Sequence, residues 1–237
     1  MSKFDFSAFF KPYDTAIKQY NQHSRFLFYW YIIPLLVAKN KPIYILETGS
    51  MHKDLPHLSE GAQGAFTLIM GDLIKNWTGG KLYTVDISKT HLDKCRETTK
   101  EFADVIEYVH SDSVSYINEI AGTIDFDLVY LDSYDLDPTN PLPSSEHHLN
   151  ELKAIYYHLK SDALIGVDDN YGPGTDIEWL YLSDRDGSVV HREVVQTGDK
   201  VVGKGAKIDP FLISRGWKRH VEFDYPAANN VYCYERN

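Results

Sequence analysis

Acidic side chains recur where short apolar stretches of this chain end. Five stretches that have the composition of buried strands each finish at or beside a carboxylate, and these residues are Glu47, Asp86, Asp112, Asp132 and Asp169. A single aspartate at such a place is commonly a turn residue or a helix cap. In a parallel sheet, however, the carboxyl ends of the strands share the edge at which ligands bind. Acids at all five ends therefore predict a binding site there.

The segments around these acids predict the elements that position them. Five apolar runs alternate with amphipathic, helical segments, and the runs are PIYILETG (42–49), KLYTVDIS (81–88), VIEYVHSD (105–112), FDLVYLD (126–132) and ALIGVDDN (163–170). Alternating strands and helices indicate a parallel sheet with helices on both faces. Strands that are apolar almost throughout are typical of burial on both sides. The expected fold class is α/β, a Rossmann-like doubly wound sheet.

The C-terminal part has a different pattern. Residues 208–217 predict a helix that Gly216 stops, and residues 218–225 and 229–236 predict two strands with no room for a helix between them. Such a pair is expected to be antiparallel, which gives a mostly parallel sheet with an antiparallel last strand. Residues 187–205 are compatible with a hairpin or a loop.

The N-terminal part predicts helices. Residues 14–38 have a helical pattern that begins at a cap on Asp14. The apolar run 26–38 is shorter than the roughly 18–20 residues that cross a bilayer, and Pro34 interrupts it. We expect residues 1–40 to form a helical cap or dimerisation segment on a single domain of residues 41–237. It would pack over the carboxyl edge of the sheet or in a homodimer interface, because monomers rarely expose such a patch.

Composition limits the partners and the compartment. The formal net charge of −10 argues against binding to bulk nucleic acid or to anionic membranes, which needs a basic face. Two cysteines are too few for a disulfide framework, which favours a reducing compartment. The first ten residues lack an apolar leader pattern. We therefore expect a cytoplasmic protein whose partner is a small molecule.

Asp86 is the most informative of the strand-end acids. An acid at the end of the second strand can accept hydrogen bonds from ribose hydroxyls. Gly49, in the turn after the first strand, allows a ligand to approach the backbone closely. No G-x-G-x-x-G motif follows that strand, which disfavours NAD, and no G-x-x-x-x-G-K-[ST] motif occurs, which excludes a P-loop.

Three motifs in this order resemble those of class I S-adenosylmethionine-dependent methyltransferases, over about residues 43–236. YILETGS resembles the first motif, which lies beside the methionine part of the cofactor. LYTVDIS resembles the second, beside the ribose, and VHSDS the third, beside the adenine. The cofactor residues that the resemblance implies are Glu47, Thr48, Gly49, Ser50, Asp86, Ile87, Asp112, Ser113 and Asp132.

One segment departs from that pattern. Residues 51–61 are inserted between the first strand and its helix, and we interpret them as a polar lid or surface loop. The insertion contains side chains that could bind a metal by type, namely His52, Asp54, His57 and Glu60.

The ends of the fourth and fifth strands predict a metal site. Adjacent strands lie about 4.8 Å apart, so Asp132 can approach the acids of residues 168–170. Carboxylates held so close repel one another, and a divalent cation, most simply Mg²⁺, would relieve this. The ligands would be Asp132, Asp168, Asp169 and Asn170. Alternatively, residues 168–170 form a turn and cap a helix after Gly174.

This arrangement resembles metal-dependent O-methyltransferases of the catechol type, and the cephalosporin-hydroxylase and rhamnosyl-O-methyltransferase group. The resemblance implies methyl transfer to a small-molecule hydroxyl. The catechol-type enzymes carry a lysine soon after the strand-four aspartate, whereas here no lysine precedes Lys153. The catalytic candidates are therefore His148, His147 and Asp132, although either histidine could instead cap or pack on its helix.

Two other functions fit the same residues. The protein could be a metal-independent N- or O-methyltransferase in which Asp132 contacts the acceptor directly. It could also be a non-catalytic module that binds the cofactor.

Overall fold

The computed structural model describes residues 4–19, 23–51, 65–182, 189–221, 224 and 229–236. The metal-ligand types noted in the 51–61 insertion, His52, Asp54, His57 and Glu60, lie outside the described residues.

The central sheet has the predicted topology. Its parallel strands are β1 (Ile43–Thr48), β2 (Gly80–Asp86), β3 (Ile106–His110), β4 (Leu128–Leu131) and β5 (Leu164–Tyr171). Two further strands, β10 (Asn230–Arg236) and β9 (Trp217–Arg219), complete the order β3-β2-β1-β4-β5-β10-β9. The pairs β5–β10 and β10–β9 are antiparallel, which confirms the expected fold class. Strand order reverses between β1 and β4, and ligands bind such sheets at the carboxyl ends beside that point.

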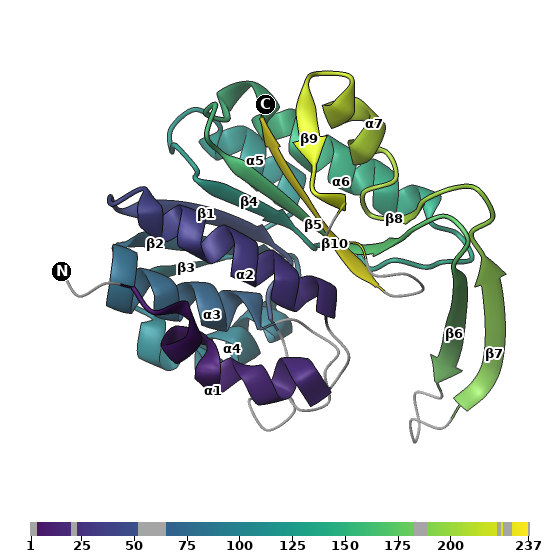
Figure 1. The fold of residues 1–237 in the computed structure, drawn as a ribbon, viewed down its shortest axis with the longest axis horizontal. Coiled ribbons are helices and arrows are strands. Elements are labelled where there is room, and N and C mark those ends of the chain that lie inside the picture. The colour runs from purple at the N-terminus through teal and green to yellow at the C-terminus, as the bar shows by residue number, and fades with distance from the viewer. Residues whose placement is uncertain are drawn as a thin grey trace.

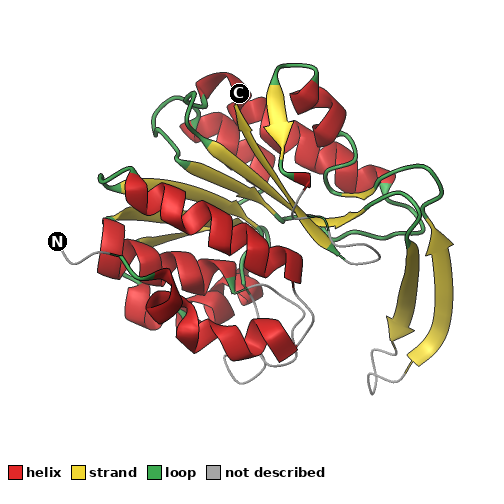
Figure 2. Cartoon of the chain, viewed as in Figure 1, coloured by secondary structure: helices red, strands yellow, loops and turns green. Residues whose placement is uncertain are grey.

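Helices cover both faces of the sheet (Figure 1; Figure 2). One face carries α1 (Phe6–Gln19), α2 (His23–Ala38), α3 (Phe66–Leu73) and α4 (Lys89–Thr98). The other face carries α5 (Ser113–Ile120), α6 (Leu142–Ile155) and α7 (Ile208–Ile213). Short helical turns lie at Ile74–Thr78, Lys100–Phe102 and Tyr156–His158.

Side-chain alternation along the strands explains these layers. In β4, Leu128 and Tyr130 pack in the core under α1–α3, whereas Val129 and Leu131 pack in the core under α5–α7. Successive residues of a strand point to opposite faces, so a strand that is apolar at every position needs a helix layer on each side. The apolar runs in the sequence thus determine a three-layer molecule.

The N-terminal helices differ from the prediction in their bounds. The first helix begins at Phe6 rather than at Asp14, because the carboxylate of Asp5 accepts a hydrogen bond from the Ala8 N–H at 3.2 Å. The chain then starts a second helix, α2, which runs through Pro34 instead of stopping there. Pro34 and Trp30 both lie on the exposed side of α2, where water can bond the Trp30 carbonyl that proline leaves without a donor.

Helix α2 belongs to the main core. Ile32, Ile33 and Leu36 are fully buried, and the Phe28 ring lies over Gly166 of β5. A Cβ at Gly166 would come within 2.6 Å of that ring, so only glycine lets the helix pack this closely. The predicted apolar segment therefore covers a face of the sheet, and its N-terminal end reaches the carboxyl edge. The homodimer interface remains a prediction.

A hairpin projects from the body after β5 (Figure 1). It consists of β6 (Asp176–Leu182) and β7 (Val189–Gln196), which pair in antiparallel register. The sequence analysis left residues 187–205 as either a hairpin or a loop, and it did not predict β6. The following strand, β8 (Val202–Gly203), pairs with β5 rather than with β7. The helix considered after Gly174 is not formed, because β6 starts there.

Within the described residues, no helix combines the length and apolarity needed to cross a membrane.

Candidate functional site

A cavity of about 270 Å³ opens at the carboxyl edge of the sheet. Strand ends and the first turns of the following segments line it, and the residues are Gly49, Val85, Asp86, Ile87, Asp112, Ser113, Ser133, Tyr134 and His147. Five of them are among the cofactor residues that the sequence implied. The cavity lies beside β1, where the strand order reverses.

Backbone forms one wall of this cavity at Gly49. Its φ is +80°, and a Cβ there would lie 2.8 Å from the carbonyl carbon of Asp132. The Gly49 N–H donates to the Val85 carbonyl at 2.8 Å. The turn after β1 is thus held directly against the turn after β4. A larger residue would separate them, so glycine is required for both its φ and its size.

Asp86 is held rigidly beside the cavity. One carboxylate oxygen accepts hydrogen bonds from the Ser50 N–H at 2.9 Å and the Ser50 hydroxyl at 2.8 Å. The other oxygen accepts from the Ser88 N–H at 2.7 Å. Asp86 is only 8% exposed. A carboxylate has about four lone-pair sites, so this one can still accept ligand hydroxyls. Ser50 does not line the cavity and instead orients Asp86.

Glu47 and Thr48 lie beneath the cavity, not in its wall. The Glu47 carboxyl is 2% exposed and accepts from the Thr67 hydroxyl at 2.8 Å and 3.0 Å. Burial raises the pKa of Glu47 to about 8. On the opposite face, the Thr48 hydroxyl accepts from the Asp132 N–H at 3.2 Å. Neither side chain is among those that line the cavity.

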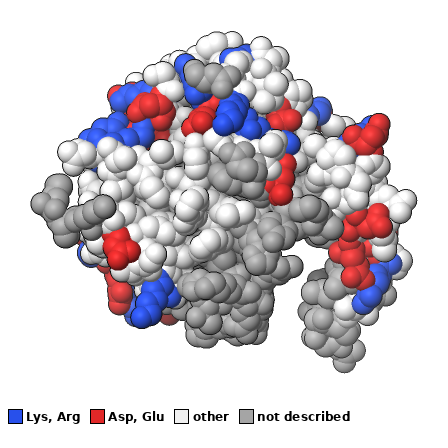
Figure 3. All heavy atoms as spheres, in the orientation of Figure 1, with Lys and Arg blue, Asp and Glu red and all other residues white. Residues whose placement is uncertain are grey.

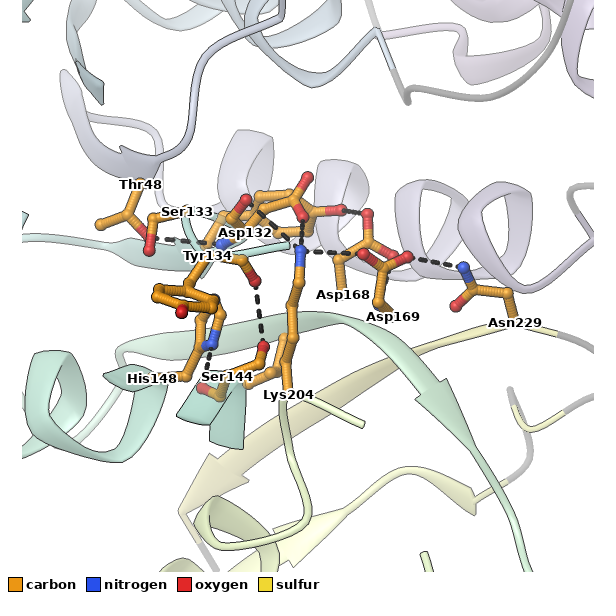
Figure 4. A network of polar contacts seen from close by, with 12 residues as sticks. Thr48, Asp132, Ser133, Tyr134, Ser144, His148, Asp168, Asp169, Lys204 and Asn229 are labelled. Carbon is orange, nitrogen blue, oxygen red and sulfur yellow. Dashed lines mark hydrogen bonds and ion pairs between the residues drawn. The ribbon is translucent and has the colours of Figure 1, made fainter. Parts of the chain in front are cut away.

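The two adjacent histidines occupy different environments. His147 lines the cavity, and its Nε2 lies 3.0 Å from the Ser113 hydroxyl and 3.3 Å from a Glu151 oxygen. The hydrogen bond with Glu151 raises the pKa of His147. His148 is fully buried and donates from Nδ1 to the Ser144 carbonyl at 2.7 Å (Figure 4). Burial lowers the pKa of His148 to about 4.

These environments correct the catalytic prediction for His148, which has no access to the cavity. His147 has access, but it contacts the part of the wall that holds Ser113, where the resemblance places adenine.

Glu151 is a site residue that the sequence analysis missed. It is fully buried and accepts from the hydroxyls of Ser133 at 2.6 Å and Thr48 at 3.3 Å. Burial alone would raise the pKa of Glu151, but the hydrogen bond with His147 and its other partners lower it. Its position four residues after His147 on a predicted helix was the available signal, because residues at that spacing are neighbours.

A charged cluster lies where β4 and β5 end. The ammonium of Lys204 lies between Asp132 and Asp169, bonded to Oδ1 of the first and 2.8 Å from Oδ2 of the second (Figure 4). Arg25, from α2, donates through Nη2 and Nε to one oxygen of Asp168 at 2.6 Å and 3.0 Å. Three carboxylates thus face two cations, neither of which the sequence analysis considered.

The two consecutive aspartates at the end of β5 make their shortest charged contacts with different cations. Asp169 has a φ of +51°, in the left-handed region that few residues other than glycine adopt. Asp168 points toward α2 and also accepts from the Tyr130 hydroxyl at 2.7 Å, whereas Asp169 points toward Lys204. Burial alone would lower the pKa of Lys204, but the charges of Asp132 and Asp169 raise it above its ordinary value. Lys204 is therefore a cation at neutral pH.

The four residues predicted as metal ligands do not converge. Asn170 turns away from the cluster, since its Oδ1 accepts from the Gly205 N–H at 2.6 Å and its Nδ2 donates to the Val167 carbonyl at 2.8 Å. Asp168 accepts two hydrogen bonds from Arg25, and the Lys204 ammonium lies between Asp132 and Asp169. Across the described residues, no group of three or more histidine, cysteine or acidic side chains has the geometry of a metal site. The arrangement does not fit a bound Mg²⁺ ion.

Comparison with known proteins supports the fold. No protein-family model and no curated protein matches the chain. Among solved structures, a candidate rRNA methylase from Clostridium thermocellum superposes with a TM-score of 0.51 at 13% identity, over 86% of this chain and 95% of that one. The CcbJ methyltransferase from Streptomyces caelestis superposes with a TM-score of 0.50 at 14% identity, over 86% and 94%. At these identities the likeness establishes the fold alone, a Rossmann-like α/β sheet.

Proposed function

We propose that the protein is an S-adenosylmethionine-dependent methyltransferase that acts on a hydroxyl or an amine of a small molecule. The observation that carries the proposal is the cavity at the carboxyl edge, which brings Asp86, Asp112 and Ser113 together around a backbone wall at Gly49. These residues come from the ends of three strands, in the places where the three sequence motifs put the cofactor.

The cavity has two distinguishable ends. Asp86 and Ser113 mark the end suited to a nucleoside, because the Asp86 carboxylate can accept hydrogen bonds from ribose hydroxyls. Gly49 packs against the backbone of Asp132, so the reacting end of the cofactor would lie toward the charged cluster. His147 and Tyr134, whose ring centroids are 5.4 Å apart, would then flank the base rather than the acceptor.

Asp132 is the residue best placed to meet an acceptor. Its side chain is 30% exposed, and Oδ1 is bonded to Lys204, so Oδ2 is the oxygen that would meet an acceptor. A carboxylate oxygen accepts hydrogen bonds, so it selects groups that carry a proton, such as hydroxyls and amines. The cluster holds three carboxylates against two cations, and burial raises the pKa of the Asp132 carboxyl, so the site favours a neutral or cationic acceptor over an anionic one.

When bound, S-adenosylmethionine supplies a methyl group on a sulfonium, which the acceptor's lone pair takes while the carbon–sulfur electron pair stays on sulfur as the neutral thioether. Asp132 receives the proton that the acceptor loses, directly or through water. Asp86 and the Gly49 backbone hold the cofactor in place, so that proximity and alignment supply most of the acceleration.

The surface supports a small acceptor over a nucleic acid. In Figure 3, basic and acidic side chains are interspersed on the visible face of the molecule, and the hairpin carries both signs. With a net charge of −10, the chain lacks the basic excess that nucleic-acid binding needs.

Cofactor binding tests the first half of this proposal. We expect the wild-type protein to bind S-adenosylmethionine and S-adenosylhomocysteine in calorimetry, and Asp86→Ala to weaken binding by about 1.5–3 kcal/mol, the scale of a hydrogen bond to a charged group. Asp104→Asn is the control, because Asp104 is exposed just before β3, at the opposite end of the strand from the cavity. If the wild type binds the cofactor and Asp86→Ala binds it with the same affinity, Asp86 is not part of the cofactor site.

Turnover measurements test whether the protein transfers the methyl group and whether Asp132 takes part. On a panel of small phenols and amines, we expect Asp132→Asn to keep cofactor affinity and to reduce methyl transfer by roughly 10²–10⁴-fold, the range for a lost general base. Cofactor binding with no turnover on any acceptor would instead favour a non-catalytic binding module.

A further inference from the structure

Lys204 is among the largest fully buried side chains of the described chain, and only 1% of it is exposed. A buried ammonium is tolerated only where opposite charges and hydrogen bonds compensate the loss of water. Here Asp132 and Asp169 provide them, and these are the carboxylates that end β4 and β5.

The backbone around Lys204 is fixed to the end of β5. The Lys204 N–H donates to the Asp169 carbonyl at 3.2 Å, and the Gly205 N–H donates to the Asn170 side chain at 2.6 Å. Gly203 has a φ of +152°, and a Cβ there would lie 2.7 Å from the Asn170 Cα. The close approach of the two segments therefore requires glycine. Asn170, which the sequence analysis assigned to a metal, instead anchors the loop that delivers the lysine.

We propose that the Lys204 ammonium is a built-in cation of the acceptor site, in the place between two strand-end carboxylates where the sequence predicted a divalent metal. Its part in methyl transfer rests on the proposed function. Lys204 does not reach the surface, so it acts as a positioning residue: it neutralises Asp132 and Asp169 and fixes Asp132 toward the acceptor.

A buried ammonium in the place of a metal ion restricts the class of acceptor that the site can bind. A metal with open positions favours acceptors that offer two neighbouring oxygens to it. Here the exposed atoms belong to carboxylates, since Asp132 and Asp169 are 30% and 24% exposed and the ammonium is covered. One hydroxyl or amine hydrogen-bonded to Asp132 is sufficient, and the reaction needs no added divalent cation.

The experiment compares the wild type with Lys204→Met, which keeps an unbranched side chain one atom shorter and removes its charge. Lys207→Met is the matched control, because Lys207 lies three residues further on but is exposed and pairs with Glu146. The binding of Mg²⁺ and of Mn²⁺ is measured by calorimetry. Thermal stability and turnover are then measured in EDTA and in each metal, in the same buffers.

We expect the wild type and Lys207→Met to bind neither metal and to keep full activity in EDTA. Lys204→Met should lose turnover by about 10²-fold or more, as expected when Asp132 is misplaced. It should also bind Mn²⁺, which restores part of its thermal stability, because the two carboxylates have lost their cation. Adding Asp132→Asn to this variant should abolish the acquired binding.

Two results would overturn the inference. One is a wild-type protein that binds Mg²⁺ or Mn²⁺ and loses that binding in Asp132→Asn. The other is a folded Lys204→Met variant that binds no Mn²⁺. If Lys204→Met does not fold, the metal titration of the wild type still decides between the two cations. Failure of the wild type to bind S-adenosylmethionine would refute the proposed function alone, because the metal titrations do not depend on it.

Discussion

Glu47 should make the stability of the folded protein fall as pH rises through neutrality. Its carboxyl is buried beneath the cavity, and its pKa is about 8 instead of the ordinary 4.5. Between these two values the folded protein holds a proton at Glu47 that the unfolded chain has lost. Stability rises with pH only where the unfolded state binds more protons, so here it must fall. The contribution is fully present below pH 4.5 and is lost as pH passes through 8.

The size of the effect follows from the shift. Each unit of pKa corresponds to 1.36 kcal/mol, so the free energy of unfolding should drop by about 2–3 kcal/mol between roughly pH 5.5 and 7.5 through this group alone. Glu47→Gln removes the titration but keeps a group that can hydrogen-bond Thr67. The difference in unfolding free energy between the variant and the wild type isolates Glu47, because other titrating groups cancel.

Urea unfolding, followed by tryptophan fluorescence at several pH values, measures this difference. We expect Glu47→Gln to gain stability relative to the wild type at each step from pH 5.5 to 7.5. Glu119→Gln, on the exposed side of α5, should run parallel to the wild type. Parallel curves for Glu47→Gln as well would show that Glu47 is already ionised in the folded protein, which would refute the reasoning from burial.

Two further predictions concern the cavity wall. Gly49→Ala places a methyl group against the backbone after β4 at a positive φ, so we expect it to cost about 1–2 kcal/mol of strain and roughly 1–3 kcal/mol of overpacking, with weaker cofactor binding. Gly216→Ala, at a similar φ but in open space, should show the strain alone in thermal denaturation. Glu151→Gln should lower the pKa of His147 in an NMR titration, because it removes the charged partner of the imidazole. Glu146→Gln is the control and should leave the pKa of His147 unchanged. An unaltered pKa of His147 in Glu151→Gln would mean that His147 and Glu151 are not hydrogen-bonded in solution.

The sequence by itself determined the α/β architecture. Alternating apolar runs and amphipathic segments are local patterns, and short loops leave few ways to connect them. The antiparallel ending followed from the missing helix between the last two strands. That Asp86, Asp112 and Asp132 share one edge also followed, because every parallel strand ends on the same side of the sheet.

Local pattern did not separate neighbouring residues whose environments differ. His147 and His148 are adjacent in the sequence, yet a helix with 3.6 residues per turn points them about 100° apart, one into the cavity wall and the other into the core. Asp168 and Asp169 point to opposite sides of β5, as strand alternation predicts, but which cation each of them meets does not follow from that pattern.

Only the tertiary structure decided which cation meets the strand-end carboxylates. Arg25 is 143 residues from Asp168 in the sequence, and Lys204 is 72 residues from Asp132. A pair of acids has the same composition whether it binds a metal ion or an ammonium group, so the sequence around those acids predicts a cation without identifying it. Its identity depends on loop and helix packing that brings distant residues together, and packing of that kind leaves no periodic signal in the chain.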